Sequence, residues 1–174
     1  MRRFLFIFVV GLSSLLSACG GGGPPPVPAV ISPVATVING IPVPPDPGPA
    51  NDQTLAGIDS NGNGVRDDVE RAIAQAYGGA PAEWKAAMQG AQALQQTMVA
   101  NGNPALAAVA NDAAMRAGYC LADSFPAADT SKVARASGTM FAWTAGTPQR
   151  LAAFDATQTI STPFQYFSSG KACE

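Results

Sequence analysis

The feature that most limits the fold of this chain is an alanine-rich stretch from residue 51 to residue 174. Apolar residues recur there every three or four positions, a spacing that places them on one face of a helix. No strand-like alternation of apolar and polar residues follows Ala50. At roughly 120 residues, the stretch has a normal size for one domain with its own core. The sequence therefore predicts an all-α domain, a small bundle of four to five helices.

Residues that favour helix ends divide this stretch into segments. Proline is favoured in the first turn, asparagine, aspartate and threonine cap the N-terminus, and glycine ends the helix. These boundary residues are Gly78 and Gly79, Pro81, Asn101 and Gly102, Asn103 and Pro104, Asp129, and Thr147 and Pro148. We expect the segments that they delimit to be the helices of the bundle.

Two groups of apolar residues in these helices are candidates for the core. The third helix is expected to bury Leu106, Val109, Ala110, Ala113, Ala117 and Cys120. The larger residues either belong to the core or line a hydrophobic ligand pocket; they are Trp84, Tyr119, Phe141, Trp143, Phe154 and the methionines. Their helical spacing favours the core.

A proline-rich segment, residues 19–50, precedes the helical domain. Ten prolines lie between residues 20 and 49, and the only charged residue there is Asp46. Such a composition cannot assemble a core and predicts a disordered, extended tether. Within it, Asn39-Gly40 between two short apolar runs is typical of a hairpin over residues 34–43, although Pro33 and Pro42 argue against one. If it forms, the hairpin also offers a strand to a partner.

The first 18 residues have the order of parts of a signal peptide. Arg2 and Arg3 precede an apolar run, residues 4–16, and Ser17 and Ala18 follow it directly before Cys19. The run is shorter than the roughly 20 apolar residues that a membrane-spanning helix needs. We therefore expect residues 1–18 to direct export and then to be removed.

The segment Leu16-Ser17-Ala18-Cys19 resembles the lipobox of bacterial lipoproteins. The resemblance implies that Cys19 carries diacylglycerol and anchors the mature chain to a membrane of the bacterial cell envelope. Gly20, in place of aspartate, resembles the pattern that Gram-negative lipoproteins of the outer membrane carry. The alternative is an ordinary signal peptide followed by an incidental cysteine.

The cysteine count leaves one possible disulfide. The chain has three cysteines, and lipidation would consume Cys19, so that only Cys120 and Cys173 remain to pair. Disulfides persist in the oxidising compartments that exported proteins reach. The alternative is two buried free thiols.

Charge and composition exclude several classes of function. Without Arg2 and Arg3, 8 basic residues stand against 12 acidic ones, a net charge of about −4. A protein with this negative net charge does not attract nucleic acid. The chain has no histidine, which excludes a histidine-based catalytic triad, a histidine general base and the usual mixed zinc sites.

Residues 59–70, Asp-Ser-Asn-Gly-Asn-Gly-Val-Arg-Asp-Asp-Val-Glu, resemble the calcium-binding loop of EF-hands. Calcium takes six to eight oxygen ligands, which a short loop supplies only by wrapping around the ion, and Gly64 permits the sharp turn. The resemblance implies side-chain ligands from Asp59, Asn61, Asn63 and Asp67, the backbone carbonyl of Val65, and a bidentate Glu70 at the start of a helix.

Two departures from paired EF-hands limit the resemblance. Arg66 occupies the eighth place, where paired loops carry an aliphatic residue, and residues 47–58 make a poor incoming helix. The segment is therefore more similar to the single loops of secreted bacterial proteins related to dockerins and thrombospondin type 3 repeats. With three carboxylates, its affinity is expected at about 10⁻⁴ to 10⁻³ M. The alternative is an Asx-rich turn in which Asp67 or Asp68 only caps a helix.

These features lead to a first functional hypothesis, a non-catalytic, membrane-anchored module in which calcium stabilises a surface for an envelope protein partner. A second is an envelope enzyme or ligand carrier that uses carboxylates such as Asp112, Asp123 or Asp155, although no catalytic motif accompanies them. A third is a passive spacer or adhesin component, supported only by the long tether.

Overall fold

The computed structural model describes residues 36–125, 129–160 and 173. The expected signal peptide and Cys19 lie outside these residues, as does the tether before residue 36. The chain divides into two units, Met1–Ser32 and Pro33–Glu174, and only the second contains described residues. Its elements are β1 (Thr36–Ile38), β2 (Ile41–Val43), the 3₁₀ helix η1 (Gly48–Gln53), α1 (Asp67–Tyr77), α2 (Pro81–Ala100), α3 (Pro104–Ser124), α4 (Thr130–Thr144) and α5 (Pro148–Gln158).

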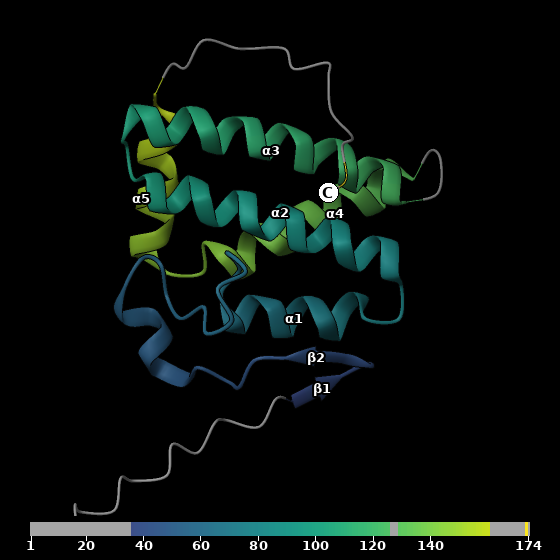
Figure 1. Cartoon of the computed structure of the whole chain (residues 1–174). Helices are drawn as coiled ribbons and strands as arrows, with labels where there is room; N and C mark the ends of the chain where they lie inside the picture. The colour runs from purple at the N-terminus through teal and green to yellow at the C-terminus, as the bar shows by residue number, and fades with distance from the viewer. Residues whose placement is uncertain (1–35, 126–128, 161–172, 174) are drawn as a thin grey trace, which may run out of the picture. The chain divides into compact units, whose positions relative to one another are not determined.

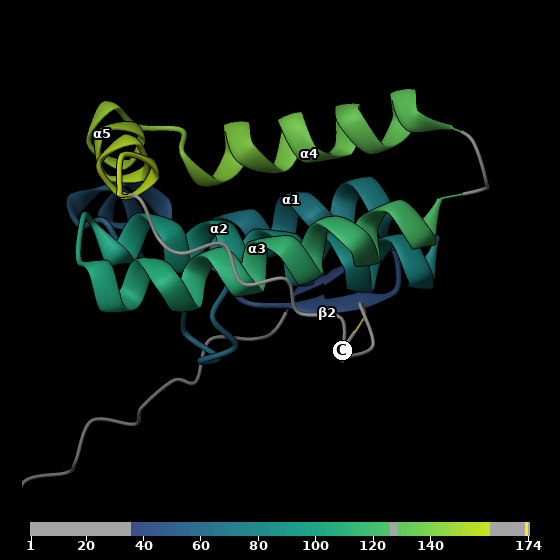
Figure 2. The same cartoon turned by 90° about the horizontal axis from the view of Figure 1, so that it is seen from above.

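The α2 helix is the centre of the bundle and contacts each of the other four helices. Helices α1, α2 and α3 lie side by side (Figure 1). Figure 2 shows α4 running along one side of this layer and α5 crossing it at one end. Mostly helical and with five packed helices, the unit confirms the predicted fold class.

Small side chains make up much of the core. Val69 and Ile73 of α1 pack with Ala87 and Ala91 of α2 and with Leu121 of α3, all at most 3% exposed. Alanine at these positions lets neighbouring helix backbones approach closely. The alanine-rich composition therefore builds the interior of the bundle as well as its helices.

The predicted helix boundaries are confirmed by capping hydrogen bonds. The Asn103 side chain accepts from the backbone N–H groups of Ala105 and Leu106, at 3.0 and 3.2 Å. Asp129 accepts from the N–H of Lys132 at 3.1 Å, and Thr147 from that of Arg150 at 3.2 Å. Hydrogen bonds from the Ser131 side chain and the Lys132 backbone lower the pKa of Asp129. These bonds satisfy N–H groups that a helix start leaves unpaired.

The prediction for the buried face of α3 was partly wrong. Leu106 and Val109 are 50% and 64% exposed, whereas Ala107 and Ala110 are fully buried against the neighbouring helix. An alanine-rich helix offers small residues on several faces, so its sequence does not fix which face is buried. Here the face with the smaller side chains packs inward.

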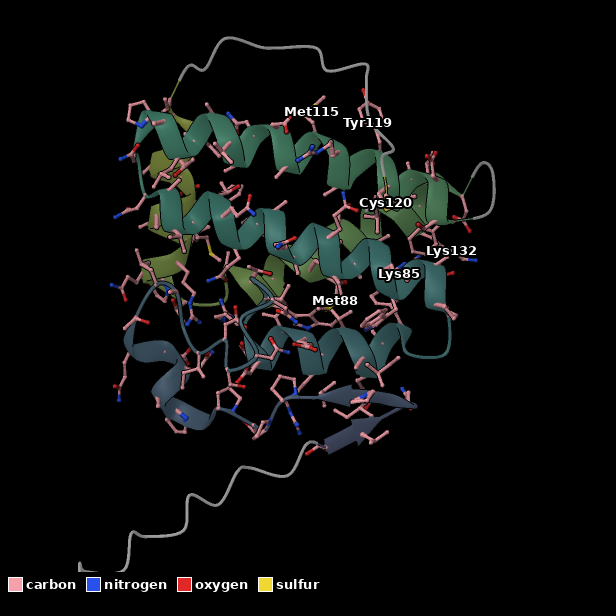
Figure 3. The ribbon with its side chains drawn as sticks, in the orientation of Figure 1. Lys85, Met88, Met115, Tyr119, Cys120 and Lys132 are labelled. Carbon is pink, nitrogen blue, oxygen red and sulfur yellow. A yellow bond between two sulfur atoms is a disulfide. The ribbon has the colours of Figure 1, made fainter. Side chains whose placement is uncertain are left out.

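The large apolar residues belong mostly to the core, as the sequence predicted. Trp84 and Trp143 pack against it, and Phe141 of α4 meets Phe154 of α5 edge to face, with ring centroids 4.9 Å apart. Met115 and Tyr119 are exceptions, at 38% and 50% exposed. Figure 3 shows both on the side of α3 away from α2.

The hairpin predicted inside the proline-rich segment is present. Strands β1 and β2 pair antiparallel across Asn39 and Gly40, which have φ angles of 48° and 82°. The Asn39 side chain donates to the carbonyls of Ala74 and Gln75 near the C-terminus of α1, at 3.3 and 2.9 Å. These residues fall in the segment expected to be a tether, but they pack against α1. The asparagine of the turn satisfies helix-end carbonyls.

Cys120 and Cys173 form the expected disulfide, with their Cα atoms 4.7 Å apart. The bond joins α3 to the end of the chain across a sequence separation of 53 residues. Closing a loop of this length reduces the entropy of the unfolded chain. The bond therefore stabilises a bundle whose small core residues each bury little area.

We predict that replacing both cysteines, Cys120→Ala with Cys173→Ala, lowers the free energy of unfolding by roughly 4 kcal/mol, the loop-entropy value for this separation. Denaturant unfolding on a Cys19→Ala background, which prevents thiol exchange, measures it. A reducing agent should destabilise the protein that retains the disulfide and leave the double variant unchanged. Equal unfolding midpoints for the two proteins would contradict the prediction.

Candidate metal centre

The candidate calcium loop, residues 59–70, joins the irregular segment after η1 to the first turn of α1 (Figure 1). Two of its hydrogen bonds fix its base and its first half. The Asp67 N–H donates to the Ile58 carbonyl at 2.8 Å, and the Gln92 amide of α2 donates to the Asn63 carbonyl at 3.3 Å. The loop is thus closed at its base and held against the central helix.

The Asp59 carboxylate organises the first half of the loop. It accepts hydrogen bonds from the backbone N–H groups of Gly62, Asn63 and Gly64, at 2.9, 3.2 and 2.8 Å. Gly64 has a φ angle of 82°, which suits glycine in the sixth place. The backbone therefore turns at Gly64, as expected, and curls around the Asp59 carboxylate.

Three of the predicted ligand residues converge on one atom. The side-chain amides of Asn61 and Asn63 both donate to Oε2 of Glu70, at 3.0 and 2.9 Å. Glu70 lies in the first turn of α1, as expected for the twelfth place. The third, fifth and twelfth places of the loop therefore meet at a single point.

The other two predicted ligand residues, Val65 and Asp67, are each 2% exposed. Val65 packs its side chain into the core, which leaves its backbone as the group available to an ion. The Asp67 carboxylate accepts from the N–H of Ser60 at 2.9 Å, across the loop. Asp67 thus ties the start of the helix to the start of the loop.

The alternative of an Asx-rich turn with a capped helix is supported in its first part, because Asn61 and Asn63 each accept from the backbone N–H two residues on, at 3.2 and 2.9 Å. The second part finds no support in α1. Its N-cap residue is Arg66, and no side chain there accepts a capping hydrogen bond. Asp67 accepts from Ser60, and Asp68 pairs with Arg66 at 2.9 Å. Neither aspartate caps the helix, so the acidic residues of its first turn have other roles.

Among the described residues, the three carboxylates proposed as ligands have no cationic partner. Within residues 36–125, 129–160 and 173, no Lys or Arg lies within ion-pair distance of Asp59, Asp67 or Glu70. Over the same residues, no group of three or more Asp, Glu, His or Cys side chains could hold a metal ion. A cation here would depend on the amide and carbonyl oxygens as much as on the carboxylates.

Arg66 has a role that the sequence did not reveal. Its side chain is 1% exposed, and its guanidinium donates to the carbonyls of Thr144 and Trp143 at 2.8 and 2.9 Å. Both carbonyls lie at the C-terminus of α4, where helix carbonyls lack intrahelical partners. Arg66 thus connects the loop to the bundle.

Arg150, in the first turn of α5, makes a parallel connection. It is 2% exposed and donates to the carbonyls of Asn51, Thr54 and Leu55 and, at 2.8 Å, to the Asp52 carboxylate. All four partners belong to η1 or to the segment just after it. Arg150 therefore holds the chain that leads into the loop.

Gly57 lies where the two buried arginines meet. Its φ angle is 66°, and a Cβ added there would overlap the Arg66 side chain and Asn51 Oδ1 and crowd Arg150. Asn51 Oδ1 also accepts from the N–H of Ile58 at 3.0 Å. The contact of Gly57 with two arginine side chains could not be predicted from the sequence, because Arg150 comes from a distant part of the chain.

The carboxylates considered for catalysis do not gather. Asp112 pairs with Arg116, one turn away on the same helix, at 3.2 Å. Asp123 lies three turns further along α3, about 16 Å by helix geometry. Asp155 is exposed on α5, a helix that meets the other end of α3 through a hydrogen bond from Gly102 to Thr157 at 3.1 Å. These three residues form no common site.

Comparisons of the chain with protein-family models, with curated proteins and with solved structures found no match.

We predict that Gly57→Ala destabilises the protein by roughly 2 kcal/mol or more, because the new methyl group displaces a buried arginine in addition to straining the backbone. Gly48→Ala is the matched control. Gly48 has a similar φ angle, 58°, but nothing lies within 4 Å of an added Cβ. The control should lose about 1 kcal/mol from backbone strain alone. Denaturant unfolding compares the two, and equal losses would contradict the crowding at Gly57.

Proposed function

We propose that this chain is an exported, lipid-anchored helical module that binds calcium at residues 59–70 and has a non-catalytic, structural or interaction role at the bacterial cell envelope. The observation that carries the calcium proposal is the convergence of Asn61 and Asn63 on Glu70. In an EF-hand-type loop these residues surround the ion. These hydrogen bonds support the proposal by placing the three side chains side by side, and binding requires each amide to turn its oxygen toward the ion.

The charge of the loop supports a cation as its ligand. Asp67 and Glu70 are 2% and 5% exposed, and neither has a basic side chain beside it among the described residues. Buried carboxylates are unfavourable unless paired or coordinated. Calcium suits the mixture of carboxylate, amide and carbonyl oxygens, whereas magnesium demands a stricter octahedron and usually keeps several waters.

Each ligand residue has a distinct role in the proposal. Asp59, Asn61 and Asn63 contribute side-chain oxygens, Val65 its carbonyl, Asp67 a direct or water-mediated oxygen, and Glu70 both oxygens. An amide oxygen has two lone pairs, so Asn63 Oδ1 can accept the Val65 N–H and still face an ion. With three carboxylates, the affinity falls in the range of extracellular sites, about 10⁻⁴ to 10⁻³ M.

The location rests on the lipobox-like segment Leu16–Cys19. The Cys120–Cys173 disulfide supports export, because disulfides persist in oxidising compartments. None of the described helices is both long and apolar enough to cross a bilayer. In this proposal the lipid on Cys19 provides the membrane attachment, and Gly20 directs the chain to the outer membrane of a Gram-negative cell.

We predict that calcium raises the free energy of unfolding by about 2.7 kcal/mol when its concentration is a hundredfold above Kd, because it binds only the folded state. Glu70→Gln should remove this effect by deleting the carboxylate on which the loop closes. Glu83→Gln, the same change in the first turn of α2, should leave it intact. Unfolding curves in calcium and in chelator make the comparison, and identical curves for the unaltered protein would refute the calcium site.

We predict that Cys19→Ala moves the protein from the membrane to the soluble fraction and abolishes its labelling by radioactive palmitate. The lipid is expected on the Cys19 sulfur, and two or more acyl chains are needed for stable anchoring. Cys173→Ala controls for loss of a cysteine and should stay in the membrane fraction. Continued acylation of the Cys19→Ala protein would contradict the lipoprotein assignment.

A further inference from the structure

Arg66 stands between two of the proposed calcium ligands. Its neighbours are Val65, which offers its carbonyl, and Asp67, which offers its carboxylate. The Val65 side chain is fixed in the core, and Asp67 is hydrogen-bonded to Ser60. The position of the backbone at residue 66 therefore depends on the contacts that Val65 and Asp67 make.

The guanidinium of Arg66 satisfies the end of a distant helix. Its hydrogen bonds to Thr144 and Trp143 span sequence separations of 78 and 77 residues. The carbonyl end of a helix carries partial negative charge, which a cation stabilises. Asp68 aligns the guanidinium by accepting from Nε and Nη2 at 2.9 and 3.0 Å. The guanidinium N–H groups reach the carbonyls at the end of α4 only while the backbone of residue 66 stays in this position.

We call residues 143–150, from the last residues of α4 to the first turn of α5, the α4–α5 turn. Buried arginines hold it at both ends. Arg66 binds its first two carbonyls, and Arg150 extends from it to the segment after η1. The two arginines differ in one respect. Arg66 lies inside the proposed metal loop, whereas the carbonyl partners of Arg150 all precede residue 59. Among the described residues, only Arg66 connects the turn directly to the proposed ligands.

We propose that calcium binding is coupled through Arg66 to the turn at residues 143–150, so that the ion controls how often this turn opens. The inference rests on the proposed calcium site. The bound ion would add ligand contacts at residues 65 and 67, on either side of Arg66, and so stabilise the backbone position from which the guanidinium reaches the end of α4. Because the coupling is reciprocal, closure of the turn also raises the affinity for calcium.

Hydrogen exchange of the full chain, followed by mass spectrometry in calcium and in chelator, tests the coupling. In the unaltered protein, calcium should slow exchange in residues 59–70 and, on the order of tenfold, in residues 141–152. Residues 104–118 of α3 serve as the internal reference and should not respond. The titration of residues 59–70 with calcium measures metal binding independently of the turn.

Two matched substitutions locate the coupling. Arg66→Lys keeps the charge but cannot bridge two carbonyls and Asp68, so residues 141–152 should lose most of their response while the loop still binds calcium more weakly. Arg150→Lys should speed exchange of the turn in both conditions and preserve the response to calcium.

The possible outcomes separate the two proposals. If calcium protects the loop of the unaltered protein but leaves residues 141–152 unchanged, the coupling is refuted and the calcium site stands. A full response of the turn in the Arg66→Lys protein also refutes it. If calcium protects neither region, the metal site itself is refuted. The unaltered protein alone decides between these cases, even if Arg66→Lys fails to fold.

Discussion

The burial of two arginine guanidinium groups is the interaction on which the arrangement of the loop and the bundle depends. A buried charge is costly unless every polar atom around it is satisfied. Arg66 and Arg150 meet this condition mainly with backbone carbonyls, at the end of α4 and in the segment after η1. Those carbonyls lack partners in regular secondary structure, so each arginine satisfies acceptors that otherwise remain unpaired. The irregular segment before α1 keeps its shape through side chains from the far end of the chain.

The composition of the bundle explains why such supports matter. Alanine allows α2 and its neighbours to approach closely, but a buried methyl group contributes only a fraction of the stabilisation of a buried leucine or phenylalanine. The buried apolar area of this interior therefore contributes less stabilisation than that of a core made of large side chains. The disulfide at Cys120, the two arginines and the Asn39 contact with the end of α1 each add a specific connection. Together these connections specify how the helices are arranged. The alanine-rich faces alone do not fix that arrangement.

Sequence reasoning succeeded where the deciding interactions are local. Caps at Asn103, Asp129 and Thr147 act within one helical turn, and their residue types indicate their role. The turn at Gly64, which has a φ angle of 82°, was likewise indicated by the residue type. The disulfide is an exception, because the cysteine count predicted it although its two residues lie 53 positions apart. Reasoning failed for Leu106 and Val109, since which face of α3 is buried depends on α2. It also could not foresee the role of Arg66, whose partners lie 77 and 78 residues away.

The weak affinity expected of the proposed site determines the kind of effect that calcium can have. At a concentration equal to Kd an ion adds about 0.4 kcal/mol, and at ten times Kd about 1.4 kcal/mol. These values are small beside the roughly 4 kcal/mol that loop entropy assigns to the disulfide. Such an ion does not decide whether the bundle folds. The free energy of binding is nevertheless large enough to change how often one turn opens, because local openings need far less free energy than global unfolding. In our proposal, a weak site beside Arg66 would therefore act on the loop and the α4–α5 turn, while the alanine core and the disulfide would hold the rest of the bundle.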